Sequence, residues 1–147
     1  MKKLIIFLFL IPLISHAQTK ETVSIFNGGN CTVSCLETFS NDSLVSAYVI
    51  FEAKDDRLPT LKNYFTVSYD KPCNVYKFLN ELEAFCGIDS VSITEICRHK
   101  VEKIKGSADL KVYDERGVIF HRFSPKLISG IRNELNEWAE NNSIKLE

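Results

Sequence analysis

The feature that most constrains the fold is one amphipathic segment, residues 72–87, which stands between segments with the alternation of β-strands. Its apolar residues recur with the spacing of a single helical face, at Val75, Phe78, Leu79, Leu82, Phe85 and Cys86. Pro72 suits the first turn of a helix, and Gly87 suits the position just after its end. The pattern predicts one helix of about four turns, with strands on both sides of it.

Four segments with strand patterning precede this helix, at residues 22–26, 31–39, 44–53 and 61–69. In the second segment, Cys31, Val33 and Cys35 fall on one face. The third segment has apolar residues on both faces, which favours a strand in the middle of a sheet. An Asn-Gly-Gly-Asn turn at residues 27–30 joins the first two segments. We therefore predict an antiparallel meander before the helix.

The segment at residues 91–105 fits two structures. Its apolar residues have helical spacing, and Ser92 with Glu95 forms a capping box. Its content of Val, Ile and Thr favours strands instead, so helix and strand both stay open. Residues 108–113 and 118–123 then alternate on either side of a turn, which predicts a hairpin.

The last predicted element is a second helix that runs from Ser124 to about Asn141. Ser124 suits its N-cap and Pro125 its first turn. Together the elements predict an α+β fold, a mostly antiparallel sheet of six or seven strands covered on one face by the two amphipathic helices. The length of residues 18–147 is typical of a single domain.

The first seventeen residues have the organisation of a secretory signal peptide. Lysines begin the segment, residues 4–14 form an apolar run, and Ser15 and Ala17 provide the small residues of a cleavage site. The apolar run is too short to span a bilayer stably. We expect cleavage near Ala17, leaving a soluble mature chain of residues 18–147 without a membrane span, in the periplasm or outside the cell.

Composition and motifs exclude several classes of function. The chain carries 18 Lys and Arg against 19 Asp and Glu, whereas a nucleic-acid-binding domain would show a basic excess. The sequence lacks the nucleotide-binding, metalloprotease and serine-hydrolase motifs, so we expect no cofactor, no metal site and no nucleic-acid partner. Asn30, Asn41 and Asn141 each begin a glycosylation sequence, and whether these are used stays open.

Reactive chemistry in the predicted mature chain depends on its five cysteines, Cys31, Cys35, Cys73, Cys86 and Cys97. An exported protein is expected to form disulfides, and an odd count leaves one thiol over. Cys31 and Cys35 on one strand would lie about 13 Å apart, and Cys73 and Cys86 on one helix about 20 Å apart, both too far for a bond. We favour a disulfide between Cys86 and Cys97, since the chain after Gly87 could fold back.

Two classes of function remain. The first is a non-catalytic exported protein that binds another protein or an envelope component, because no catalytic set is visible. The alternative is a small cysteine-dependent hydrolase or thiol-redox enzyme, with His99 and His121 as the imidazoles left in the mature chain. An activated thiolate would distinguish the two. The partner and the oligomeric state are not specified by the sequence.

Overall fold

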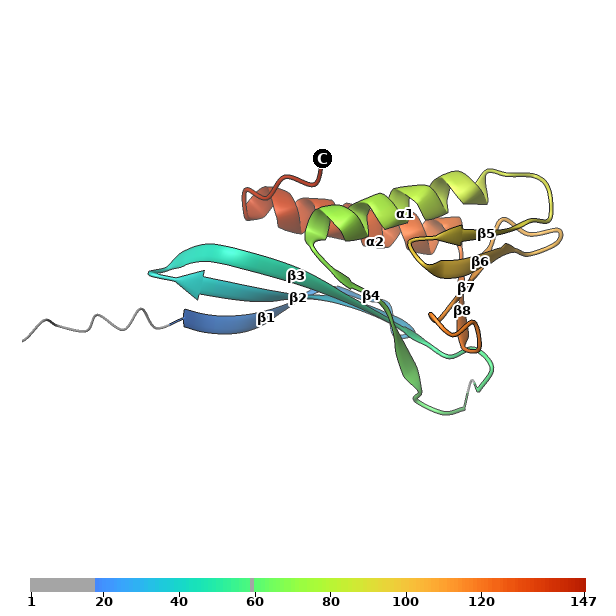
Figure 1. Cartoon of the computed structure of the whole chain (residues 1–147), viewed down its shortest axis with the longest axis horizontal. Coiled ribbons are helices and arrows are strands. Elements are labelled where there is room, and N and C mark those ends of the chain that lie inside the picture. The colour runs from blue at the N-terminus through green and yellow to red at the C-terminus, as the bar shows by residue number, and fades with distance from the viewer. Residues whose placement is uncertain (1–17, 59) are drawn as a thin grey trace, which may run out of the picture.

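The computed structural model describes residues 18–58 and 60–147. These residues form two four-stranded antiparallel sheets and two helices (Figure 1). In chain order the elements are β1 (Gln18–Asn27), β2 (Cys31–Ser40), β3 (Ser43–Lys54), β4 (Tyr64–Asp70), α1 (Pro72–Cys86), β5 (Ile93–Ile96), β6 (His99–Lys103), β7 (Leu110–Tyr113), β8 (Phe120–Phe123) and α2 (Pro125–Asn141). The chain therefore makes the same arrangement twice, a four-stranded meander followed by a helix. We call β1–β4 the first sheet and β5–β8 the second sheet.

The predicted α+β class with antiparallel strands is confirmed, but the prediction of one sheet with six or seven strands is wrong. The main reason is the segment at residues 91–105, which forms β5 and β6 rather than a helix. Cys97 and Arg98 turn the chain between them with positive φ angles of 47° and 70°. The β-branched content of this segment thus outweighs its helical spacing.

Both helices lie side by side along the first sheet, and the second sheet lies beside the carboxyl half of α1 (Figure 1). The apolar face predicted for α1 is confirmed, since all six of its residues are buried. α2 buries Ile128, Ile131, Leu135 and Trp138 in the core. β3 lies between β2 and β4, as its two apolar faces predict.

Polar contacts tie the second sheet to the first. The Asp56 carboxylate accepts hydrogen bonds from His121 Nδ1 at 3.0 Å and from the Arg122 backbone N–H at 2.7 Å. The Asp56 backbone N–H donates to the Phe120 carbonyl at 3.0 Å. These bonds fasten the connection between β3 and β4 onto β8, so they set the position of the second sheet.

A buried lysine holds the second sheet to the end of α1. Lys103 on β6 is 6 % exposed, and its ammonium donates to the carbonyls of Cys86 and Ala108. The carbonyls at a helix C-terminus have no partner within the helix and carry partial negative charge. Lys103 therefore stabilises the α1 terminus and fixes β6 beside it.

Two predictions concern membranes and export. In the part of the chain that the structure describes, no helix has the length and apolar character needed to cross a bilayer. The predicted signal peptide, residues 1–17, lies outside the described residues.

Candidate binding groove

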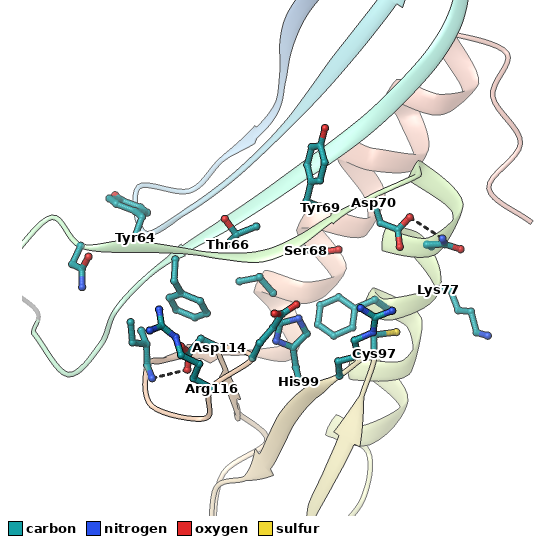
Figure 2. A pocket seen from close by; sticks show the side chains of 18 residues that line it. Tyr64, Thr66, Ser68, Tyr69, Asp70, Lys77, Cys97, His99, Asp114 and Arg116 are labelled. Atoms are coloured by element: carbon teal, nitrogen blue, oxygen red, sulfur yellow. Dashed lines mark hydrogen bonds and ion pairs between the residues drawn. The ribbon is translucent and has the colours of Figure 1, made fainter.

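A groove of about 980 Å³ lies between the first sheet and the second (Figure 2). One wall is residues 63–70, which comprise β4 and the residue before it. The opposite wall comes from two hairpin tips. One is residues 97–99, the β5–β6 turn and the first residue of β6, and the other is residues 114–116 between β7 and β8. Residues of α1 close one end. We call this site the β4 groove, and its volume is in the range of ordinary ligand sites.

β4 presents an unpaired backbone edge to this groove. It is the last strand of the first sheet and pairs only with β3. The Asp55 N–H donates to the Asn63 carbonyl at 2.8 Å, so the backbone groups of Asn63 face β3. In an antiparallel ladder these groups alternate from side to side, which turns those of Tyr64 and Thr66 toward the groove. A strand edge of this kind can accept another strand.

The side chains of β4 alternate as its backbone does. Phe65 and Val67 are buried. Tyr64 and Thr66 are exposed and point to the other side of the strand (Figure 2). The Tyr64 hydroxyl donates to the Gly29 carbonyl at 2.8 Å, which fixes that ring against the first hairpin. The β4 edge is thus held in place by contacts on both faces.

His99 lines the groove opposite β4 (Figure 2). Its Nδ1 lies 2.8 Å from the Tyr113 carbonyl oxygen, and because a carbonyl only accepts, Nδ1 carries the proton. The ring is 5 % exposed and packs against Phe78 of α1 at a centroid distance of 5.7 Å. These contacts fix the ring between β6 and α1.

The end of the groove near α1 carries two basic side chains, Lys77 and Arg98, and one acidic side chain. Asp70 also lines this end, but its Oδ1 accepts from the Lys71 N–H at 2.7 Å and from Asn74 Nδ2 at 2.9 Å. Lys77 is exposed, and its Nζ lies 4.0 Å from Glu81 Oε1. Arg98 makes no ion pair with any other described residue. This end therefore favours a negatively charged ligand group.

The other end of the groove carries one net negative charge, because Asp114, Glu115 and Arg116 line it. Asp114 Oδ1 accepts from the backbone N–H groups of Val118 and Ile119 at 2.7 and 2.9 Å, which holds the β7–β8 turn in shape. Its Oδ2 lies 3.8 Å from Arg116 Nε. The Asp114 carboxylate therefore forms its contacts within its own hairpin.

The predicted disulfide between Cys86 and Cys97 is not formed, and all five cysteines are free thiols. β5 runs back along α1 and places Cys97 in the groove beside Lys77. Cys86 is the last residue of α1, about 13 Å further along the helix axis than Lys77. That separation explains why the two cysteines do not meet. Cys73 lies half-buried in the first turn of α1.

Four thiols have a raised pKa, those of the buried Cys31, Cys35 and Cys86 and that of the exposed Cys97. Burial raises the pKa of Cys31 to about 12 and that of Cys35 to about 12. Burial also raises the pKa of Cys86 and of Cys97. A reactive cysteine needs a lowered pKa, so these four thiols lack the activation that nucleophilic catalysis requires.

His121, the second histidine, has a structural role. His121 Nδ1 donates to the Lys54 carbonyl at 2.9 Å and to the Asp56 carboxylate at 3.0 Å. The negative charge of Asp56 also raises the pKa of the Cys31 thiol. Cysteine, histidine and aspartate thus lie in one region, but the thiol there is buried and protonated.

Among residues 18–58 and 60–147, no three His, Cys, Asp or Glu side chains gather closely enough to hold a metal ion. Sequence reasoning missed the groove. The signal that could have found it is the uncharged stretch from Tyr64 to Tyr69, which is unusual for an exposed edge strand.

Comparison with known proteins supplies no role for these residues. No family model, no curated protein and no solved structure matches this chain. The candidate site is therefore defined by its geometry and charge.

Proposed function

We propose that this chain is a non-catalytic exported protein that binds another protein or a component of the cell envelope through the β4 groove. The observation that carries the proposal is the groove itself, which combines an unpaired strand edge with an arginine that has no ion pair among the described residues. Sheet edges and apolar grooves with a few polar groups are typical sites of protein contact.

Export is part of the same proposal. It is supported by the charge, apolar run and small residues of the first seventeen positions. Periplasmic or extracellular location would place the groove where it meets other exported chains. The amino-terminal sequence of the protein recovered from outside the cytoplasm would begin at Gln18 if cleavage follows Ala17.

The alternative, a cysteine-dependent hydrolase or redox enzyme, would use Cys97, since it lines the groove two residues from His99. Burial is the main cause that raises the pKa of this thiol, and the Glu81 carboxylate adds to it. Iodoacetamide at pH 6 should therefore label Cys97 no faster than a free cysteine. Labelling much faster than free cysteine would favour the enzyme.

Site-specific photo-crosslinking in the protein's own cells tests the binding proposal. A benzophenone side chain replaces Glu115, an exposed residue of the groove wall, and in a matched variant it replaces Val45, which is 53 % exposed and not part of that wall. We expect a discrete crosslinked product from position 115 and none from position 45. Equal products from both positions, or none from either, would contradict a binding role for the groove.

A further inference from the structure

We propose that the β4 groove receives an extended acidic segment of a partner protein, which adds to β4 as a fifth strand of the first sheet. This inference rests on the proposed binding function and specifies the chemistry of the partner. Strand addition is a general mode of peptide recognition, in which main-chain hydrogen bonds give affinity and alternate side chains give specificity.

The first argument is the shape of the groove. Its wall contains eight successive residues, 63–70, so the groove runs along the edge of the strand and not across one face of the sheet. Seven residues of β4 offer an edge of about 23 Å at about 3.3 Å per residue. An extended segment matches that length, whereas a compact ligand would contact only part of it.

The second argument is the contrast between the two edges of the first sheet. β1, at the opposite edge, carries Lys20 and Glu21 and a register shift between Ser24 and Phe26. Charges and bulges of this kind discourage strand pairing. The stretch from Tyr64 to Tyr69 carries no charge, and its own irregularity lies beyond Thr66, where the register shifts. The backbone groups of Tyr64 and Thr66 thus remain available for pairing.

The third argument is the lining of the groove. Phe65, Val67 and Phe78 face it from the first sheet and α1, and Ile119 faces it from the second. Every second side chain of an added strand would point toward these residues, so apolar side chains are favoured at alternate positions. The remaining side chains would point toward solvent beside Tyr64 and Tyr69.

The fourth argument is charge. Arg98 lines the groove and has no ion pair among the residues described. An acidic side chain near the α1 end of the added strand would pair with Arg98 and Lys77. The chain's own amino-terminal segment carries Lys2 and Lys3, whose positive charges would be repelled by Arg98 and Lys77.

A second copy of the chain fits less well than a different protein. β4 already lies between β3 and the hairpin tips of the second sheet. It therefore cannot leave that position to enter the same groove of a second molecule. The other edge strand, β1, carries charges of both signs and a register shift between Ser24 and Phe26.

Affinity measurements on two pairs of variants test the inference. A displayed library of random twelve-residue peptides is selected on the purified chain, and the selected peptides are titrated against each variant. Thr66→Pro removes the N–H that faces the groove, and proline is tolerated at such edge positions. Thr66→Val changes the same side chain and keeps the N–H. We expect Thr66→Pro to bind the peptides about tenfold more weakly than Thr66→Val, because only the proline variant lacks the N–H.

The charge argument has its own variants. Arg98→Gln should weaken the selected peptides roughly twofold to fivefold, and the loss should shrink at high salt. Arg122→Gln, at an exposed arginine of β8 that does not line the groove, is the matched control and should have no effect. Acidic residues should be enriched among the selected peptides. Thermal melts of all four variants confirm that each one is folded.

The outcomes separate this inference from the proposed function. If the peptides bind Thr66→Pro as tightly as the wild type, strand addition is wrong, although the groove still binds. If no peptide is selected and the chain instead self-associates on sizing, the partner is a second copy and the inference is overturned. If the crosslink from position 115 also fails, the binding function itself is wrong.

Discussion

The two sheets are built in the same strand order but are held together differently. The strands of the first sheet have ten, ten, twelve and seven residues, whereas those of the second have four, five, four and four. The first sheet carries the apolar face on which both helices lie. Long strands can therefore bury enough apolar area to fix their own position.

The second sheet depends more on buried polar groups. Four polar residues of its strands and turns are buried, namely His99, Lys103, Asp114 and His121. Each forms hydrogen bonds to backbone groups or to a carboxylate. The comparison indicates that apolar burial stabilises the first sheet, while directional bonds set the position of the second. Because the β4 groove lies between them, its shape depends on those bonds.

The largest effect is expected from the apolar side of this comparison. Phe51 on β3 is fully buried and meets Phe123 of β8 edge to face at 5.6 Å. Phe51→Ala should lower the free energy of unfolding by about 3–5 kcal/mol, because it leaves a cavity between the sheets. Urea unfolding measures the loss. Val118→Ala, at a residue 57 % exposed, should change stability by less than about 0.5 kcal/mol.

A smaller but more local effect on stability is expected from the polar contacts that hold the second sheet. Asp56→Ala removes the acceptor of His121 Nδ1 and of the Arg122 N–H. The free energy of unfolding should fall by about 1–3 kcal/mol, and amide exchange should accelerate in β8 more than in β2. Asp89→Ala, in an exposed loop, is the control. Uniform acceleration in both sheets would show that the second sheet is not fastened at this contact.

The smallest effect is a pH dependence. Asp55 is buried and accepts from Arg57 Nε at 3.0 Å and Nη2 at 2.9 Å, which holds the pKa of Asp55 below its ordinary value. Because the folded pKa lies below the unfolded value of about 3.9, the ionised carboxylate stabilises the fold above that pH. This stabilisation is lost as the pH falls from about 5 through the folded pKa.

Urea midpoints measured between pH 6 and pH 3 test that dependence. Asp55→Asn should reduce the loss of stability on acidification, since the variant has no carboxylate to protonate. Asp89→Asn should keep the wild-type slope. An unchanged slope in Asp55→Asn would show that this carboxylate does not couple folding to pH.

Sequence patterns predicted the elements whose signals are local. The face of α1 follows from the spacing of Val75 to Cys86, and the central place of β3 follows from its two apolar faces. The N-cap of α2 is also confirmed, since Ser124 Oγ accepts from the Leu127 N–H at 3.2 Å. These features depend on residues close together in the chain.

The division into two sheets and the groove could not be predicted, because they depend on distant contacts. Asp55 and Asp56 lie in the connection between β3 and β4, yet Asp55 is fully buried and Asp56 forms a hydrogen bond to His121 of β8, sixty-five residues away. The groove brings together β4 and two hairpin tips that the sequence separates. The distance between Cys97 and Cys86 could not be predicted for the same reason. It depends on β5, which forms in a segment whose sequence fits a helix and a strand equally well.

The most direct test of the central claim is a titration of the ¹⁵N-labelled chain with a selected acidic peptide, followed by NMR. The β4 groove predicts the largest shift changes at residues 63–70 and 97–99, with slower amide exchange at Tyr64 and Thr66. Changes concentrated on β1 or α2, with exchange at Tyr64 and Thr66 unaltered, would contradict the account.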